Sequence, residues 1–210
     1  MKKLLFIAAV LVLGTTSAFA QFTNTGSTSS NRGGGAYETQ RSLKISYMPA
    51  KIKGDGGGDI SLNGATIELV NRQGISQDAP LYAEYGVGAS WVGGEIEDTD
   101  LKVNYFSLQV PLYLGYQYNV SDKVAVSPYA GIYLRGNIFG NYKIGGESYN
   151  AFDKDEVGDL KLNRFNIGWR IGVNFDFEKV YIGASYGSDF NDIIDHGKEQ
   201  LPQITVGFNF

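Results

Sequence analysis

The sequence predicts an all-β fold, namely an eight-stranded antiparallel up-and-down β-barrel that spans a membrane. The clearest observation is the stretch 105–118, YFSLQVPLYLGYQY, where apolar or aromatic residues fill the even positions and mostly polar or small residues the odd ones. This period of two fits a strand with one apolar and one polar face. An ordinary globular strand has about 5–6 residues, whereas a tilted strand needs about 9–11 residues to cross a bilayer. Length and alternation together favour a membrane-spanning strand.

Similar alternation recurs along the chain in a series of predicted strands. They cover residues 41–52, 60–71, 81–92, 103–118, 123–138, 160–177, 179–190 and 202–210. The connections after the fourth and sixth segments are short, and those after the third, fifth and seventh are long and rich in Gly or Asp. Transmembrane barrels have short periplasmic turns and longer outer loops, so this order predicts a periplasmic start. The connections 53–59 and 72–80 fit the alternation less well.

The composition agrees with a barrel. The chain has 28 Gly, 14 Tyr and no Cys, and its mean hydropathy is −0.16. A helical membrane protein would be far more hydrophobic, whereas half of each barrel strand faces a polar interior. Closed strand pairing can stabilise a secreted chain that lacks disulfides.

The N-terminal 40 residues predict export followed by a polar leader. Lys2 and Lys3 precede the apolar run Leu4–Leu13, and small residues at Ala18 and Ala20 fit a cleavage site, so residues 1–20 read as a signal peptide. A transmembrane anchor is the weaker alternative because the run is shorter than about 20 residues. Residues 21–40, rich in Ser, Thr, Asn and Gly, predict a flexible periplasmic leader, with a plug of the barrel interior as the alternative. The barrel itself is predicted over residues 41–210.

The charge of the chain argues against nucleic acid as a partner. Without Lys2 and Lys3, 16 basic residues face 22 acidic ones, which gives a net charge of −6. Phosphate backbones are bound by basic patches, and the composition offers no such excess.

The assignment of faces separates a membrane barrel from a soluble, lipocalin-like barrel, whose apolar face points inward. One face of the predicted strands carries large aliphatic residues with aromatics near the ends, as a lipid-facing belt does. The other face carries charged residues, which we expect to form a lumen charge network. Its predicted members are Lys44, Glu68, Glu84, Arg135, Arg170 and Asp176.

With these features, the chain resembles the small outer-membrane barrels of the OmpA/OmpX type. More narrowly, LQVPLYLGYQY followed by VSPYAGIYLRG resembles the PorT-like "outer membrane protein β-barrel domain" family of Bacteroidetes-type bacteria. The closing LPQITVGFNF resembles the signal read by the outer-membrane assembly machinery. The residues that match this insertion signal are Ile204, Val206, Phe208 and Phe210. The resemblance implies insertion into the cell outer membrane, with lipids, lipopolysaccharide and the assembly machinery as partners.

No catalytic, cofactor or metal site is predicted. His196 is the sole His and lacks a nucleophile motif such as G-x-S-x-G, and one His without Cys makes a zinc site improbable. Acidic residues cluster in the outer loops, including Asp189, Asp192 and Asp195 in the last one. They could bind Ca²⁺, but no spacing matches a calcium loop, so solvated surface charge is the simpler interpretation.

Three functions remain open at this point. The preferred one is a non-enzymatic structural or surface-interaction protein that acts through its long outer loops. The second is an accessory of a secretion or gliding system, as the PorT-like resemblance implies, with a secretion-system protein as partner. The third is a narrow porin-like channel, although side chains usually fill the interior of an eight-stranded barrel.

Overall fold

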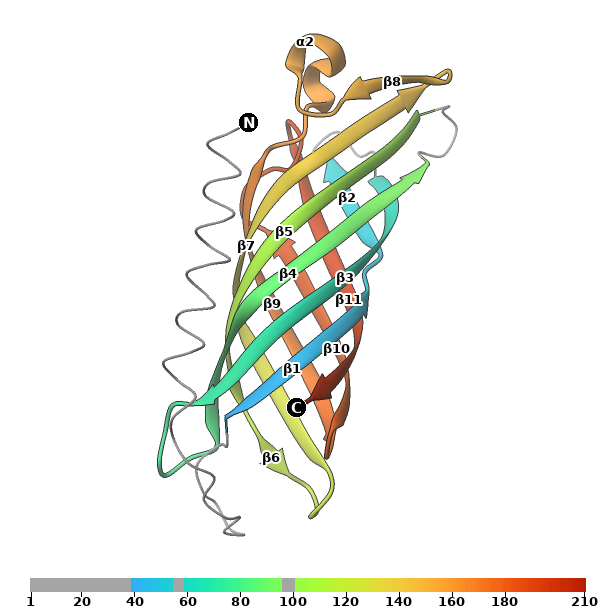
Figure 1. The fold of residues 1–210 in the computed structure, drawn as a ribbon. Helices are drawn as coiled ribbons and strands as arrows, with labels where there is room; N and C mark the ends of the chain where they lie inside the picture. The colour runs from blue at the N-terminus through green and yellow to red at the C-terminus, as the bar shows by residue number, and fades with distance from the viewer. Residues whose placement is uncertain (1–38, 55–58, 96–100) are drawn as a thin grey trace. The chain divides into compact units, whose positions relative to one another are not determined.

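The computed structural model describes residues 39–54, 59–95 and 101–210. The predicted signal peptide and nearly all of the predicted leader lie outside these described residues. The described part forms one antiparallel sheet that closes on itself as a barrel (Figure 1).

Eight strands form the barrel wall when β1 and β2, the two parts of one interrupted strand, are counted together. β1 (Gln40–Tyr47) and β2 (Ala50–Gly54) both pair with β3 (Asp59–Gly74) on one side and β11 (Gly197–Asn209) on the other. The register does not shift between them, because Tyr47 lies opposite Ile204 and Lys51 opposite Gln200. Pro49, which has no N–H to donate to a ladder, lies at the interruption.

The rest of the wall runs in chain order. Its strands are β4 (Leu81–Glu95), β5 (Leu101–Tyr116), β7 (Ala125–Ile144), β9 (Phe165–Phe177) and β10 (Val180–Asp189). Each pairs antiparallel with the next, and β10 pairs with β11. The predicted eight-stranded antiparallel barrel is therefore confirmed.

Several predicted strand ends are wrong. The sixth strand begins at Phe165, and not at Leu160, because Lys154–Val157 forms helix α2 and Gly158–Leu160 forms the 3-10 turn η1. The eighth strand begins at Gly197 instead of Pro202. β7 continues beyond the predicted end at residue 138 and forms a hairpin with β8 (Glu147–Asn150), and the short β6 (Tyr118–Asn119) also pairs with β7. Neither described helix is long and apolar enough to cross a bilayer.

The barrel has two different ends. The terminal end holds the start of β1 and the end of β11, together with the connections 75–80, 117–124 and 178–179. The loop end holds the end of β2, the starts of β3 and β5 and the end of β4, together with the connections 145–164 and 190–196. Figure 1 shows β8 and α2 at the loop end, with the C-terminus of β11 toward the opposite end. The predicted alternation of lengths holds only in part. The longest connection, 145–164, lies at the loop end and the shortest, 178–179, at the terminal end, but β4 and β5 extend into the predicted long loop 93–102 and leave 96–100, which is shorter than 75–80 or 117–124.

The apolar face of the strands points outward. On β5, Leu112 is 52% exposed and Leu114 is 60% exposed, whereas Tyr113 between them is 1% exposed. Aromatic residues lie toward both ends of this outer face, among them Tyr116 and Phe208 at the terminal end and Trp91 and Trp169 nearer the loop end. This arrangement confirms the predicted assignment of faces and excludes the lipocalin-like alternative, in which the apolar face would be enclosed.

Inside the barrel, large tyrosine side chains lie over glycines of the neighbouring strand. The register pairs are Tyr82 with Gly115, Tyr129 with Gly172, Tyr133 with Gly168 and Tyr181 with Gly207. A Cβ added at Gly115 would lie 2.2 Å from Cζ of Tyr82, and one at Gly207 would lie 2.0 Å from the same atom of Tyr181. The abundant glycine therefore makes room for tyrosine rings in a narrow interior. Protein interiors are packed about as densely as organic crystals, so a ring of this size needs a neighbour without a side chain.

We expect Gly131→Ala to lower the free energy of unfolding by about 1–3 kcal/mol, the usual cost of overpacking. A Cβ at Gly131 would lie 2.2 Å from the carbonyl oxygen of Leu112 and 2.7 Å from Cα of Tyr113. These are backbone atoms, which cannot rotate away. Urea titration of the protein in lipid vesicles measures the change.

Gly136→Ala is the matched control, because it lies on the same strand and its added Cβ would meet one atom within 4 Å, Cδ1 of Ile138 at 3.9 Å. Its effect should stay within about 0.5 kcal/mol. Equal losses in the two variants would show that close packing at Gly131 does not limit stability.

Candidate functional site

A chain of ion pairs crosses the interior toward the terminal end. Lys44 pairs with Glu84, and the Nε atom of Arg72 lies 2.8 Å from Oε2 of the same carboxylate. The Nη1 atom of Arg72 lies 2.9 Å from Oδ1 of Asp176, whose other oxygen accepts a hydrogen bond of 2.5 Å from the Ser127 hydroxyl. These side chains come from β1, β3, β4, β7 and β9, and their two positive and two negative charges balance. Buried charges are tolerated when they are paired and hydrogen-bonded in this way.

Tyrosine rings surround the cations of this chain. The guanidinium carbon of Arg72 lies 4.3 Å from the ring centroid of Tyr181 and 5.5 Å from that of Tyr82. The ammonium of Lys44 lies 5.9 Å from the ring centroid of Tyr113 and 5.6 Å from that of Tyr129. These distances allow cation–π attraction, so the rings fill the space and also stabilise the charges.

The middle of the interior holds two charged groups that do not form a direct pair. Gln109 donates a hydrogen bond of 2.8 Å to Oε1 of Glu68. Arg170 donates a hydrogen bond of 3.2 Å to the Tyr113 hydroxyl and lies 5.1 Å from the ring centroid of Tyr133. Of the predicted lumen residues, Lys44, Glu84 and Asp176 are thus joined through Arg72, while Glu68 and Arg170 lie apart from that chain.

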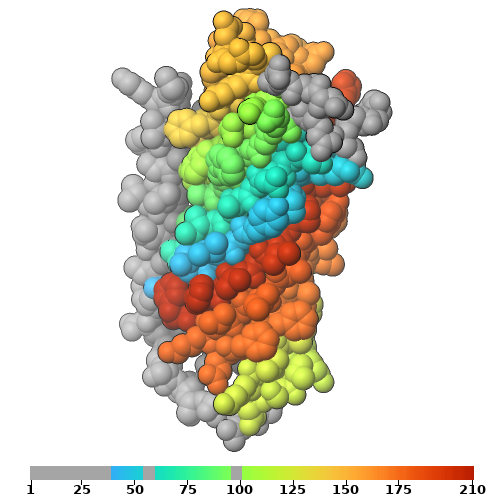
Figure 2. Space-filling view, turned by 90° about the vertical axis from the view of Figure 1, so that its right-hand side faces the viewer, coloured from blue at the N-terminus to red at the C-terminus, as the bar shows by residue number. Residues whose placement is uncertain are grey.

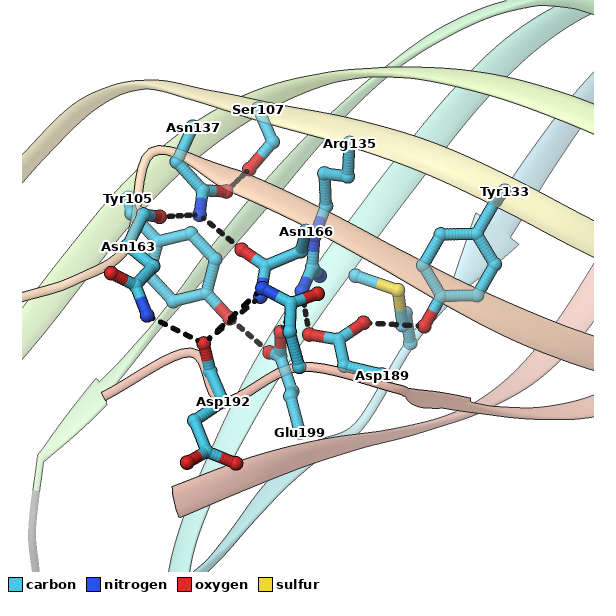
Figure 3. A network of polar contacts seen from close by, with 12 residues as sticks. Tyr105, Ser107, Tyr133, Arg135, Asn137, Asn163, Asn166, Asp189, Asp192 and Glu199 are labelled. Carbon is cyan, nitrogen blue, oxygen red and sulfur yellow. Dashed lines mark hydrogen bonds and ion pairs between the residues drawn. The ribbon is translucent and has the colours of Figure 1, made fainter. Parts of the chain in front are cut away.

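A third cluster lies nearer the loop end and is centred on Arg135 (Figure 3). The Nη2 atom of Arg135 contacts both Oδ2 of Asp189, at 2.6 Å, and Oε2 of Glu199. The Tyr133 hydroxyl donates to Asp189 at 2.6 Å, and the Tyr105 hydroxyl donates to Glu199. One guanidinium and two phenols thereby hold two buried carboxylates.

An amide layer continues this cluster toward the loops. Asn137 accepts a hydrogen bond of 2.6 Å from Ser107 and donates one of 3.0 Å to the Asn166 side chain (Figure 3). It also donates to the backbone carbonyl of Asn163 at 2.5 Å, and the Asn163 amide donates to the carbonyl of Asp192 at 2.7 Å. The barrel wall and two loops are joined through side-chain amides.

Sequence reasoning missed three members of these clusters. Asp189 was assigned to the acidic outer loops, but it ends β10 and is buried; Arg72 was assigned to a turn, but it lies within β3; and Glu199 was assigned to a loop, but it lies within β11. The sequence did contain a signal for these three residues, because each lies at an even number of positions from the inward residues of its strand. Extending the alternation past the Gly and polar residues at the strand ends would have found them.

An apolar cap lies between these polar clusters and the loop end. Its main members are Ile52, Leu62, Val92, Val103, Tyr142, Ala151, Leu162, Ile193 and Ile194. The last four come from connections, which backbone hydrogen bonds hold in place. Leu162 donates to the carbonyl of Ala151 at 2.7 Å, and Asn163 donates to that of Ile193 at 2.7 Å. Each of the nine is at most 8% exposed.

The outer loops show no arrangement for metal binding within the part of the chain that the structure describes, where no group of three or more potential ligands occurs. Asp153 accepts from the backbone N–H of Asp155 at 3.0 Å, and Glu156 accepts from that of Asn150 at 2.6 Å, so both carboxylates shape the loop itself. His196 lies exposed in the turn before β11 with a φ of 61°. The acidic residues at 97, 98 and 100 lie outside the described residues.

The four predicted insertion-signal residues share the outer face of β11 and its end. Ile204, Val206, Phe208 and Phe210 are 39–71% exposed, and Thr205 between two of them is 5% exposed. Their recognition by the assembly machinery stays a prediction.

A closed barrel with an apolar outer face and charged interior is the architecture of an outer-membrane β-barrel protein. The family described as "Outer membrane protein beta-barrel domain" matches residues 59–195, and the chain belongs to this family. Its location is therefore the cell outer membrane. The narrower PorT-like resemblance stays a prediction.

Solved structures with a similar fold share little sequence with this chain. Neisserial surface protein A is 13% identical with a TM-score of 0.50, and the match covers 82% of this chain and 99% of that one. The attachment invasion locus protein Ail of Yersinia pestis is 17% identical with a TM-score of 0.45, covering 82% and 99%. The outer membrane enzyme PagL is 14% identical with a TM-score of 0.49, covering 80% and 98%. No curated protein matches the chain. Similarity at this level shows the fold alone.

Proposed function

We propose that this chain is a closed, non-conducting and non-enzymatic outer-membrane barrel that presents an ordered interaction surface outside the cell. The observation that carries the proposal is the apolar cap. Loop residues Leu162 and Ile193, both 0% exposed, lie with inward strand residues across the interior. An ion has no favourable route through such a layer, because moving a charge into an apolar medium costs many kcal/mol.

The layers beneath the cap support the same proposal. Tyr105 and Tyr133, 2% and 0% exposed, donate to the two carboxylates of the Arg135 cluster, and further tyrosines fill the space around Lys44 and Arg72. In a barrel of eight strands the interior is just wide enough for side chains. The charges inside are thus better explained as structural ion pairs than as an ion path.

The loop end has the properties of a preformed binding surface. The β7–β8 hairpin and α2 are held by the backbone bonds of Ala151 and Leu162 and by the hydrogen bond of 2.7 Å from the Tyr142 hydroxyl to the Leu160 carbonyl. A surface that is already ordered loses less conformational entropy when a partner binds. Since long loops of such barrels face outward from the cell, we place this surface outside.

The test has two readouts on the purified protein and on a deletion strain. In planar bilayers we expect no discrete conductance steps from either the wild type or Arg170→Leu, because Arg170 lines no open path. In the deletion strain we expect normal secretion. Current steps that Arg170→Leu alters would support the narrow channel instead, and a secretion defect restored by the intact gene would support the accessory role.

A further inference from the structure

The aromatic row on the outer face is interrupted where the barrel closes. Nearer the loop end, an exposed or half-buried aromatic residue lies on each of five neighbouring wall strands or at its end. These residues are Trp91, Phe106, Phe139, Phe165 and Phe190. The rings of Phe106 and Phe139 are 6.3 Å apart, so the row is continuous there. The corresponding positions on β11 and β2 are Lys198 and Lys53, and the nearby outward Ser61 of β3 lies opposite Lys51.

Spacing along the strands places these lysines at the membrane boundary. Tyr116 and Phe106 are ten residues apart on β5, as are Phe208 and Lys198 on β11. At about 3.4 Å per residue, the rise of antiparallel strands, this is about 34 Å along a strand. With a tilt near 45° it is about 24 Å along the barrel axis, close to the apolar band of about 25 Å of such barrels. Lys198 therefore lies at the same height along the barrel axis as Phe106, at the loop-side edge of that band.

Lys53 and Lys198 are direct neighbours across the seam between β2 and β11. Both side chains are exposed, and neither forms an ion pair with any other residue that the structure describes. Like charges directly opposite each other in an antiparallel pair are destabilising. The position opposite Lys53 on its other side is Asp59 of β3. Figure 2 faces this closing region, where β1 in blue lies against β11 in red.

The polar character continues toward the membrane centre on the same side. The Tyr47 hydroxyl donates a hydrogen bond of 2.6 Å to the Asn63 side chain, and both side chains lie on the outer face. Gln200 is the next outward residue of β11. The outer face thus has a polar notch, which we define as Lys53, Lys198, Gln200, Ser61 and Asn63. Lys51 shares the outward parity of Lys53 on β2 and lies opposite both Gln200 and Ser61.

We propose that this polar notch binds a phosphate group of lipopolysaccharide in the outer leaflet. A phosphate between Lys53 and Lys198 would turn their mutual repulsion into two attractive contacts, and lysine binds phosphate as a point charge. Its oxygens could also accept from Gln200 and Ser61. The notch lies at the edge of the apolar band, where lipid headgroup phosphates lie. The choice of the outer leaflet rests on the proposed function, which places the loop end outside the cell.

The test measures the affinity for lipid A by native mass spectrometry of the full mature protein in neutral detergent. Replacing both lysines, Lys53→Gln with Lys198→Gln, should weaken binding of bisphosphorylated lipid A by about tenfold or more, because each surface lysine contributes about 1 kcal/mol toward anionic lipid. Dephosphorylated lipid A should bind the wild type and this variant equally. The matched control, Lys123→Gln with Lys179→Gln, removes two exposed charges at the terminal end and should leave the affinity unchanged.

Equal affinities of wild type and the Lys53/Lys198 variant, or equal weakening in the control, would overturn the proposal. Phosphatidylglycerol that binds as tightly as lipid A would also overturn it, because the notch would then take any membrane phosphate. Orientation is tested separately, since the chain contains no Cys. A maleimide that cannot cross the membrane should label Ser148→Cys but not Ser121→Cys on intact cells, and the reverse result would overturn the outward placement without bearing on the affinities.

Discussion

Replacing Arg135 with leucine should lower the free energy of unfolding by about 3–5 kcal/mol, as expected when one partner of a buried ion pair is removed. Arg135 is 1% exposed, and its Nη2 atom contacts both Asp189, 3% exposed, and Glu199, 0% exposed. Leucine would leave two carboxylates close together with only the Tyr133 and Tyr105 hydroxyls as donors. Urea titration in lipid vesicles at neutral pH measures the loss.

Two variants show whether uncompensated charge causes that loss. Adding Asp189→Asn and Glu199→Gln to Arg135→Leu should recover part of the stability, because neutral amides cost less to bury than carboxylates. Arg170→Leu should cost less than Arg135→Leu, since Arg170 forms no ion pair within the described residues and donates one hydrogen bond, of 3.2 Å. If the added amides gave no recovery, lost packing would be the cause instead.

Introducing arginine at Leu112 should cost about 2–4 kcal/mol, the depth-dependent penalty for a charge facing lipid near the bilayer centre. Leu112 is 52% exposed on the outer face and lies four residues from Tyr116 of the terminal-end aromatics. A guanidinium there cannot reach a polar partner without distorting the bilayer. The same urea titration, made with vesicles of fixed thickness, measures the loss.

Gln109→Arg is the comparison on the opposite face and should cost less. Gln109 faces the interior, where Oε1 of Glu68 already accepts a hydrogen bond of 2.8 Å from its amide. A guanidinium could take over that contact and pair with the carboxylate. A loss as large as that of Leu112→Arg would mean that overcrowding, and not exposure to hydrocarbon, sets the cost of an added arginine.

Local alternation predicted most of the wall because the side-chain direction in a strand depends on the parity of the residue alone. The segment 105–118 shows this well, since its odd residues Tyr105 and Tyr113 point inward and its even residues Leu112 and Leu114 point outward. The weak predictions lie at strand ends. Lys154–Leu160 precedes a strongly alternating strand, and nothing in its own pattern marked it as helical turns stabilised by the Asp153 cap.

The contacts of the interior could not be derived in the same way. Arg72 and Asp176 are separated by 104 residues, and Tyr105 and Glu199 by 94. Which inward residues meet depends on the stagger of strands around the closed barrel, and parity does not determine stagger. The predicted network therefore contained Glu68 and Arg170, which lie apart, and lacked Arg72 and the two carboxylates of Arg135.

The sequence by itself determined that this chain is a barrel with hydrocarbon outside and charge inside, because alternation is a property of each strand alone. Only the tertiary structure decided which residues form the apolar cap, since it brings Leu62 of β3 together with Leu162 and Ile193 of two distant connections. The pairing of β2 with β11, which closes the sheet, places Lys53 beside Lys198. The lysine pair depends on the register of the first strand against the last, which is fixed when the ends of the sheet meet.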